Sequence, residues 1–566
     1  MSKPSLGPAS LGPAPTFREL FTPKLVTVLR EGYGLGSLRA DAAAGLTVAV
    51  VALPLSMAIA IASGTTPDRG LYAAIFGGFL VSAFGGSRFQ IGGPAGAFIV
   101  LVAATVQRHG IDGLLLATLM DGVVLAAAGF LRLGTYIKFI PYPVTVGFTA
   151  GIAVIIFASQ VRDLLGLTLT EPEPGELLAK VMVLAHALPT ANAWALAIAA
   201  MTIAVIQVLK RRRPHWPGML MAIAAASVIT AVAGLPVETI GTRFGGIPGT
   251  LPLPHLPVFS FDLAKAVWPD ALSFALLGAI ESLLSAVVAD SMSGRRHRSN
   301  CELVAQGIAN IGSALFGGIT VTGTIARTAT NVRAGARGPI AGMLHSLFLL
   351  GFLLLAAPLA AFIPLAALAG VLAIVAWTMA ERHAFATLVR TSRADALVLL
   401  ATFGLTIFRD LGTGILVGFA LGSLLFLNRM AQSISLQAVP FDDADRAEPE
   451  NVPSHDRDVL VYRVTGAFFF GAAAAIGAAL DRLAEKPKTL LLDVSGVPFL
   501  DSTAAKAIEG TALRARKASA TLMVTGASPT VRAVLAAHGC HPPLVLFAPS
   551  IEAGLRLAHP PPDFGV

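Results

Sequence analysis

The sequence predicts a polytopic α-helical membrane protein with a small α/β domain attached on its cytoplasmic side. Three observations predict this class. Of the 566 residues, 55% are hydrophobic and 13% are charged, whereas a soluble globular chain carries roughly 25% charged residues. Apolar segments long enough to span a bilayer follow one another from Ala42 to Met430. After Arg429 the sequence turns polar and then alternates between strand and helix patterns.

The membrane part is expected to hold about 14 elements, since an upright span needs roughly 20 residues and a half-helix needs fewer. The uninterrupted apolar segments are Ala43–Ser63, Leu71–Phe84, Gly113–Leu131, Val146–Gln160, Ala193–Leu209, Gly218–Ala233, Ala271–Ala289, Gly338–Ala357, Leu365–Ala380, Ala394–Phe408 and Gly412–Leu427. Two more segments, Gln90–Val106 and Leu303–Val332, are apolar but interrupted by Gly, Pro, Thr or Arg.

Basic residues gather in alternate loops between these segments, for example at Lys210–Arg213 and Arg295–Arg298. By the positive-inside rule, this pattern puts both termini in the cytoplasm of a bacterial-type inner (plasma) membrane. The net charge of +8 is then an orientation signal, so we expect no nucleic acid as a partner. The first residues show no apolar stretch followed by a cleavage site, and we predict no signal peptide.

The C-terminal residues predict a cytoplasmic domain with a mainly parallel sheet. Strand patterns at VLVYRV, KTLLLDVS and ATLMVTG alternate with helix patterns at AAAAIGAALDRLAEK, DSTAAKAIEGTALRARK and PTVRAVLAAHG. We therefore divide the chain into a cytoplasmic segment (residues 1–40), a transmembrane domain (41–432), a linker (433–457) and a cytoplasmic domain (458–566).

The first interrupted segment predicts a helix that begins inside the membrane. Gly92–Gly93 disfavours a helix, whereas Pro94 suits the first position of one. A helix that begins near Pro94 presents the free backbone N–H groups of Ala95, Gly96 and Ala97 at mid-depth. Such irregular backbone is tolerated only where it is buried in protein or lines a wet cavity.

The second interrupted segment, VTGTIARTATN, predicts a matching helix start near Thr324 or Ile325, after Gly323. Helix N-termini bear partial positive charge and free donors, so two of them aimed at one point make an anion site. Arg327 adds a permanent positive charge with up to five N–H donors. The alternative for Arg327 is a snorkelling residue near a helix end.

The two breaks lie roughly 230 residues apart, each at the third element of a run of seven, which is the pattern of an inverted-repeat transporter with its site at the midplane. The alternative for the first break is an ordinary kink at Gly92–Pro94 that packs against a neighbouring helix. We prefer the paired interpretation because the second break carries Arg327.

Glu281 lies in the middle of the apolar segment ALSFALLGAIESLLSAVVAD. A carboxylate there should face a cavity and either pair with a cation or take up a proton. Next to an anion site it offers a way to couple proton entry to anion entry, and Ser285 shares its helix face one turn on. The alternatives are a neutral structural Glu and an ion-pair partner for Arg327.

Three further polar residues lie in apolar segments. Ser56 follows Pro54 in the first helix and is expected to line the cavity. For Asp121 we prefer packing or helix–helix hydrogen bonding as the interpretation. For His345 we prefer a structural role.

Several segments resemble the sulfate permease (SulP) family of anion transporters. They are ALPLSMAIAIASG (Ala52–Gly64), GLYAAIFGG (Gly70–Gly78), GGPAGAF (Gly92–Phe98), GAIESLLSAVVADSMSG (Gly278–Gly294) and TGTIARTATNVRAGARGPIAG (Thr322–Gly342). The tail segment LLLDVSGVPFLDSTAAKAI (Leu490–Ile508) resembles the STAS domain of that family. The resemblance spans residues 20–555 in order, and the combination of segments is specific.

The resemblance implies a 7+7 inverted repeat with two half-helices, core and gate domains, an elevator-type movement and a homodimer. It also implies that the anion lies between the half-helices, with Arg327 as its positive side chain. The implied substrate-binding residues are Ser56, Pro94, Ala95, Gly96, Ala97, Thr324, Ala326, Arg327 and Thr328. Ser285 is expected to line the cavity.

The resemblance also bears on coupling and regulation. Glu281 falls where proton-coupled relatives carry a Glu and a sodium-coupled bicarbonate branch carries an Asp, which favours protons. Many members have a Gln after the first-helix proline, whereas Leu55 follows Pro54 here, so the substrate stays open. Ser502 resembles a phosphorylated serine of related STAS domains and is a regulatory candidate, although a simple helix N-cap at Asp501–Ser502 is the preferred alternative.

We expect secondary active transport of an inorganic anion, in the first place sulfate, by proton symport or anion exchange. No covalent chemistry is implied, so we predict neither an enzyme nor a cofactor or metal. The alternatives are bicarbonate or a C4-dicarboxylate as substrate and, in another class, a non-transporting anion sensor. A nucleobase symporter would need acidic or amide side chains for hydrogen bonds to the ring, and Arg327 argues against it.

Overall fold

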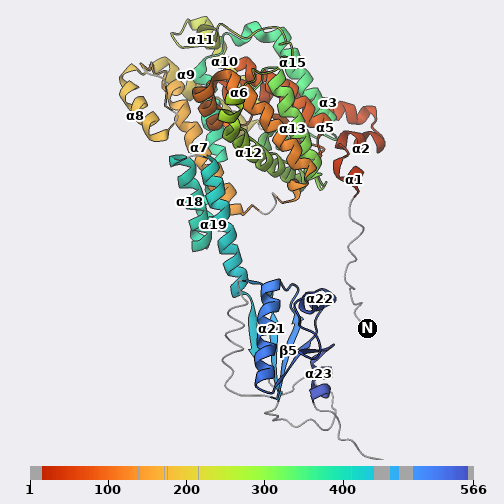
Figure 1. Cartoon of the computed structure of the whole chain (residues 1–566). Coiled ribbons are helices and arrows are strands. Elements are labelled where there is room, and N and C mark those ends of the chain that lie inside the picture. Colours follow the sequence, from red (N-terminus) through yellow and green to blue (C-terminus); the bar gives the residue numbers. More distant parts are fainter. Residues whose placement is uncertain are drawn as a thin grey trace, which may run out of the picture. The chain divides into compact units, whose positions relative to one another are not determined.

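The computed structural model describes residues 16–136, 140–170, 173–174, 176–213, 216–409, 411–438, 459–470 and 488–558. The chain forms two compact units, Met1–Phe419 and Ala420–Val566. The first unit is built of helices, and the second carries a five-stranded sheet (Figure 1).

The helices of the first unit range from single turns to spans of more than 30 residues. The N-terminal half holds α1 (Phe17–Phe21), α2 (Lys24–Arg30), α3 (Leu35–Ala62), α4 (Pro67–Tyr72), η1 (Ala73–Gly77), α5 (Gly78–Phe84), η2 (Gly96–Phe98), α6 (Ile99–Phe130), η3 (Leu133–Thr135), α7 (Tyr142–Leu165), α8 (Leu177–Ala187), η5 (Leu188–Thr190), α9 (Ala193–Arg212), α10 (Gly218–Ala233) and α11 (Ile240–Phe244). The second half holds α12 (Phe261–Ser293), α13 (Ser299–Leu315), α14 (Ile325–Arg333), α15 (Ile340–Ala360), α16 (Leu365–Met379), α17 (Arg382–Thr391), α18 (Arg393–Phe408) and α19 (Leu411–Gln432).

Among the described residues, eight helices are long and apolar enough to cross a membrane, and two shorter apolar helices accompany them. The predicted class, a polytopic helical membrane protein with a C-terminal α/β domain, is confirmed. Local chemistry sets several helix ends. The Ser260 hydroxyl accepts a hydrogen bond from Leu263 N at the start of α12, and Gly294 ends that helix with φ 69°.

The helices of the first unit pack as two groups. In the first group, α6 packs on α12 and α13, α3 packs on α15, and α14 packs on α3 and α12. In the second group, α7 packs on α16 and α18, and α9 packs on α10 and α16. Figure 1 shows α8 and α9 on one side of the unit and α2 and α5 on the other. The two groups meet where α3 contacts α10 and α16.

Both interrupted segments form a two-residue strand followed by a helix. Strand β1 (Gly92–Gly93) precedes η2 and α6, and β2 (Thr322–Gly323) precedes α14. The second helix begins at Ile325, with Thr324 as its N-cap, as the sequence predicted.

The first helix begins later than the predicted start near Pro94. Ala95 is extended (φ −115°, ψ 146°), and a single 3₁₀ turn at Gly96–Phe98 leads into α6. The reason is that the Pro94 carbonyl accepts a hydrogen bond from Arg327 instead of entering the helix ladder. Further on, the non-helical backbone of Gly110 (φ 67°) divides α6 into two helices that meet at a kink, in line with the separately predicted segments Gln90–Val106 and Gly113–Leu131.

The sheet of the second unit has the strand order β3-β4-β5-β6-β7. Its elements are β3 (Ser435–Ala438), β4 (Val459–Thr465), β5 (Thr489–Gly496), α21 (Ser502–Lys517), β6 (Thr521–Thr525), α22 (Pro529–Ala537), β7 (Val545–Ala548) and α23 (Ile551–Ala558). Strands β4 to β7 are parallel, as predicted, and β3 is antiparallel to β4. Helices α21 and α22 cover one face, and α23 covers the other.

Strand β3 lies inside the predicted linker at residues 433–457. It is tied to the sheet because Ser435 to Ala438 pair with Thr465 to Tyr462, so this part of the range belongs to the domain. The helix predicted from AAAAIGAALDRLAEK lies outside the described residues.

Candidate anion-binding site

A short antiparallel bridge brings the two breaks together. Gly92 pairs with Gly323, and Gly93 pairs with Thr322. Just beyond the bridge, Thr324 N donates to Ile91 O at 3.0 Å. The bridge therefore fixes the starts of η2 and α14 beside each other, and an antiparallel pairing is what two inverted repeats produce.

Both helix starts keep backbone donors outside their own ladders. In α14 the first ladder bond runs from Thr328 N to Thr324 O at 3.0 Å, so the N–H groups of Ile325, Ala326 and Arg327 precede it. In η2 the first bond runs from Phe98 N to Ala95 O at 3.1 Å. These starts supply positive ends of helix dipoles at one place.

Arg327 lies between the two starts and is only 2% exposed. Its Nη2 donates to Ser56 Oγ and to Pro94 O, each at 3.2 Å. Among the described residues, its Nε and Nη1 have no hydrogen-bond partner. A buried guanidinium with two open donors and no carboxylate is a strong anion ligand, because an unmatched buried charge is otherwise very unfavourable.

Gly93 shows how closely the backbone approaches this guanidinium. Its φ is 155°, and a Cβ built there would overlap Nη1 of Arg327. A side chain at this position would therefore occupy the space beside one of the open donors.

The predicted site residues differ in exposure. Ser56, Thr328, Ala95 and Ala97 are buried, Gly96 is half-buried and Ala326 is exposed. A Cβ at Gly96 would lie 3.3 Å from Cδ1 of Ile156 and 3.5 Å from Sδ of Met379. Because Ile156 is in α7 and Met379 ends α16, the site of the first helix group faces the second group.

Thr328 and Ser285 tie α12 to the break. The Ser285 hydroxyl donates to Thr328 Oγ1 at 3.1 Å, and the same oxygen accepts from Ile91 N at 3.0 Å. Ser285 is fully buried. These hydroxyls thus hold the break in shape, and the cavity-lining role of Ser285 stays a prediction.

Glu281 is 7% exposed on α12. The described residues give its carboxylate no hydrogen bond and no ion pair with Arg327, which removes the ion-pair alternative for this conformation. Glu281 belongs to the first helix group.

A buried polar stripe on α13 supports both breaks and was not predicted. Gln90 Nε2, just before β1, donates to Glu302 Oε1 at 3.0 Å, and Gln306 Nε2 donates to the same oxygen at 2.9 Å. Asn310 Nδ2 donates to Val321 O, and Asn310 Oδ1 accepts from Val321 N at 2.7 Å, just before β2. Sequence reasoning had one signal for it, the spacing of four between Glu302, Gln306 and Asn310.

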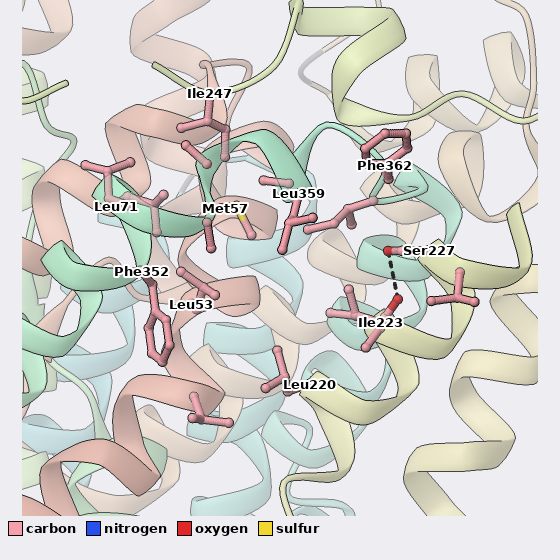
Figure 2. Close-up of a pocket in the computed structure, with 18 of the residues that line it drawn as sticks. Leu53, Met57, Leu71, Leu220, Ile223, Ser227, Ile247, Phe352, Leu359 and Phe362 are labelled. Atoms are coloured by element: carbon pink, nitrogen blue, oxygen red, sulfur yellow. Dashed lines mark hydrogen bonds between the residues drawn. The ribbon is translucent and has the colours of Figure 1, made fainter. Parts of the chain in front are cut away.

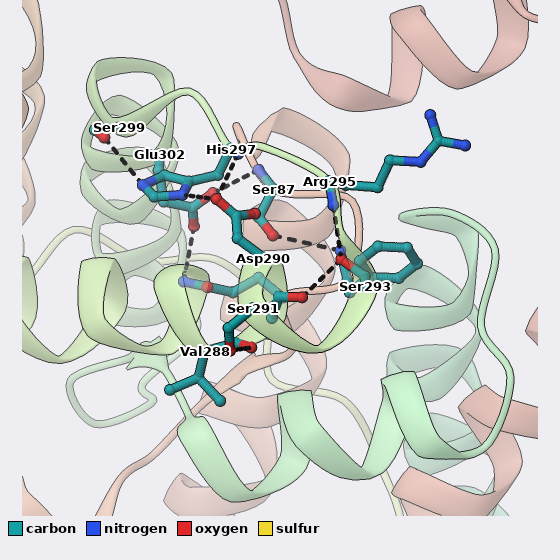
Figure 3. A network of polar contacts seen from close by, with 12 residues as sticks. Ser87, Val288, Asp290, Ser291, Ser293, Arg295, His297, Ser299 and Glu302 are labelled. Carbon is teal, nitrogen blue, oxygen red and sulfur yellow. Dashed lines mark hydrogen bonds and ion pairs between the residues drawn. The ribbon is translucent and has the colours of Figure 1, made fainter.

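Figure 3 shows how the end of this stripe is anchored. Asp290 Oδ2 lies 2.6 Å from His297 Nδ1 and accepts from His297 N at 2.9 Å. His297 Nε2 lies 3.0 Å from the Ser299 hydroxyl. Ser87 N donates to Glu302 Oε2 at 3.0 Å. The connection between α12 and α13 is therefore fixed relative to the first break.

Asp121 and His345 are fully buried, and among the described residues no polar atom of either side chain has a hydrogen-bond partner. The helix–helix hydrogen bond considered for Asp121 is not found there, because α6 and α13 approach at Gly122 and Gly307 through backbone instead. In the sheet unit, Asp501 Oδ1 accepts from Ala504 N at 2.9 Å and caps α21. Ser502 is the exposed first residue of that helix, and its regulatory role stays a prediction.

Comparison with protein families gives two matches. The sulfate permease family model matches residues 38–402, and the STAS domain model matches residues 451–553. The first match includes both breaks and every residue of the anion site.

Individual relatives agree with these matches. The chain is 40% identical over 499 residues to "Putative sulfate transporter YvdB" of Bacillus subtilis, covering 88% of this chain and 93% of that one. It is 31% identical over 513 residues to the bicarbonate transporter BicA of Synechocystis, covering 87% and 89%. The solved transmembrane domain of a cyanobacterial BicA covers 69% of this chain and 98% of its own, with a TM-score of 0.61 and 32% identity. The structure of SLC26A9 covers 94% and 92%, with a TM-score of 0.81 at 19% identity, and thus shares the fold.

Proposed function

The chain belongs to the sulfate permease family and is an anion transporter of a membrane, not an enzyme, and from this premise we propose that it carries sulfate across the cytoplasmic membrane. The observation that carries the proposal is Arg327, buried between two helix starts with Nε and Nη1 open. A tetrahedral oxyanion has several acceptor oxygens for these donors and for the free N–H groups of η2 and α14. The description of YvdB as a sulfate transporter supports the choice of anion.

Protons are the coupling ion that we propose. Glu281 lies buried on α12 of the first helix group, and the described residues give its carboxylate no hydrogen bond. An ionised carboxylate without a partner is unfavourable in such surroundings, so the conformation that buries Glu281 favours a proton on it. Proton uptake by Glu281 would then accompany anion entry. Exchange of one anion for another is the alternative and requires no proton.

Movement of the first helix group against the second is the proposed transport step. The site belongs to the first group, while η2 contacts α7 of the second and a Cβ at Gly96 would lie against Ile156 of α7 and Met379 of α16. An elevator-type displacement would carry the bridged site past these side chains as one body. We further propose a homodimer with both termini in the cytoplasm, which chemical crosslinking and cysteine accessibility from each side can test.

Bicarbonate is the second candidate substrate, favoured by 31% identity to BicA. A C4-dicarboxylate has weaker support, because its second carboxylate needs a second cation. Among the described residues at the bridge, Arg327 is the buried arginine. A sensor without flux would bind the anion and leave vesicle contents unchanged.

One uptake panel tests the proposal. Proteoliposomes with the full chain receive labelled sulfate, bicarbonate, chloride or succinate at two external pH values. We expect sulfate uptake that rises when the outside is more acidic than the inside. Uptake of bicarbonate but not sulfate would show that bicarbonate is the substrate, and binding without any flux would identify a sensor.

A further inference from the structure

A cavity with a volume of about 440 Å³ lies against the opposite side of α3 from the anion site. Its wall combines α3 and α15 from the first helix group with α10 from the second (Figure 2). Leu53 and Met57 of α3 face it, whereas Ser56, directly before Met57, contacts Arg327. The cavity and the anion site thus lie on different sides of the same turn of α3.

The lining is apolar throughout its length. Leu, Ile, Val, Ala, Met and Phe side chains form it, and Ser227 is the polar residue among those that line it. The Ser227 hydroxyl donates to Ile223 O at 2.9 Å within α10, as Figure 2 shows, so it is not offered to a ligand. No charge or free donor in the lining would recognise a polar molecule.

The stretch of α10 that lines the cavity suits an elongated occupant. Along α10 the lining runs from Leu220 to Ala231, which is about 16 Å at 1.5 Å per residue. One leaflet of the hydrocarbon core is about 15 Å thick. Val228 and Leu359, which are more than half exposed, stand at its rim and face the same medium as the other exposed apolar residues of the spans.

We propose that this cavity binds one acyl chain of a bilayer phospholipid. Because the cavity is walled by both helix groups, the chain touches α10 on one side and α3 and α15 on the other. It therefore resists displacement of one group along the other, and it supports the turn of α3 that holds Ser56 against Arg327. The bound lipid is a structural ligand at an interface that has to move.

Photolabelling tests the assignment. The full chain is placed in nanodiscs with phosphatidylglycerol that carries a diazirine in the middle of its acyl chain, irradiated, digested and mapped by mass spectrometry. We expect label concentrated at residues 220–231 and 352–363, beyond the density on lipid-exposed segments such as α9. Label spread evenly over all exposed apolar faces would overturn the proposal.

Matched variants sharpen the test. Ala356→Phe and Ala224→Phe fill the cavity from α15 and α10, and each should lower its label at least fivefold. Leu355→Phe is the control, since Leu355 is 86% exposed and does not line the cavity. The distribution of label on the wild-type protein is a test in itself. A variant that fails to fold therefore does not prevent the proposal from being tested. Two results would overturn the assignment. One is unchanged label in both filling variants when they are folded. The other is label that a free apolar compound displaces but unlabelled phospholipid does not.

Discussion

At the scale of single residues, the buried guanidinium of Arg327 decides the chemistry of the site. Burying an ion is expensive, and the described structure gives Arg327 only the neutral oxygens of Ser56 and Pro94 as partners. The balancing charge therefore has to come from a ligand. A permanently charged arginine also keeps this affinity at every physiological pH, in contrast to a histidine.

Replacing this side chain tests its role. We expect Arg327→Ala to lower sulfate affinity by about 100-fold or more, because two charge-assisted hydrogen bonds at roughly 1.5–3 kcal/mol each are lost. Equilibrium binding of labelled sulfate to the purified protein measures this. Arg333→Ala is the control, since Arg333 is exposed on the same helix. Unchanged affinity in Arg327→Ala would exclude this residue from the site.

Glu281 gives a separate prediction about coupling. Glu281→Gln keeps the shape of the side chain but cannot exchange a proton, so sulfate uptake should no longer respond to a pH gradient. Counterflow with equal pH on both sides should persist. The exposed Glu176 supplies the control variant Glu176→Gln. If the pH response of Glu281→Gln matches that of the wild type, the coupling residue lies elsewhere.

At the scale of elements, α13 acts as the support for two breaks that lie far apart in sequence. Glu302, itself held by Gln306, accepts a hydrogen bond from Gln90 two residues before β1, and Asn310 holds the residue before β2. Each short strand has only two residues and one partner strand. The bridge is therefore stable because a helix supplies the missing hydrogen bonds.

Removing one of these supports should be measurable. Asn310→Ala leaves the N–H and C=O of Val321 buried without their partner, and unpaired buried groups cost about 1–3 kcal/mol each. We expect an unfolding free energy lower by about 2–6 kcal/mol and weaker sulfate binding. Thermal unfolding in detergent measures the first effect. Asn428→Ala on the exposed face of α19 should be nearly neutral, and an equal loss there would contradict a specific support.

At the scale of the whole molecule, the membrane unit and the sheet unit each have their own core. The site residues, their supports and both helix groups belong to the first unit. Transport chemistry is therefore expected to be complete without the sheet, and we expect the sheet to contribute regulation.

Truncation tests this division, and β3 decides where to cut. A chain that ends at Gln432 should keep sulfate uptake. A chain that ends at Asp458 retains β3 without β4, and the open strand edge should promote aggregation. Size-exclusion chromatography and uptake in proteoliposomes compare the two. Complete loss of folded protein in the shorter chain would make the sheet unit structural.

The sequence predicted what local physics determines. Gly92–Gly93 and Arg327 stand out because hydrocarbon excludes irregular backbone and charge, so the pairing of the two breaks could be inferred without a structure. The helix start at Gly96 could not, because the Pro94 carbonyl is engaged by Arg327, which lies 233 residues away in the chain. The role of Asn310 could not be predicted for a similar reason. The sequence shows an amide in an apolar helix, but its hydrogen-bond partner is known only when the position of that helix is known.

The bridge between Gly92–Gly93 and Thr322–Gly323 has a consequence for the direction of flux. Because it clamps both helix starts together, the donors keep one arrangement whichever aqueous compartment they face. The dissociation constant for the anion should then be the same from either side. Such a carrier has no built-in rectification, and the electrochemical gradients of the transported ions set whether the cell fills or empties.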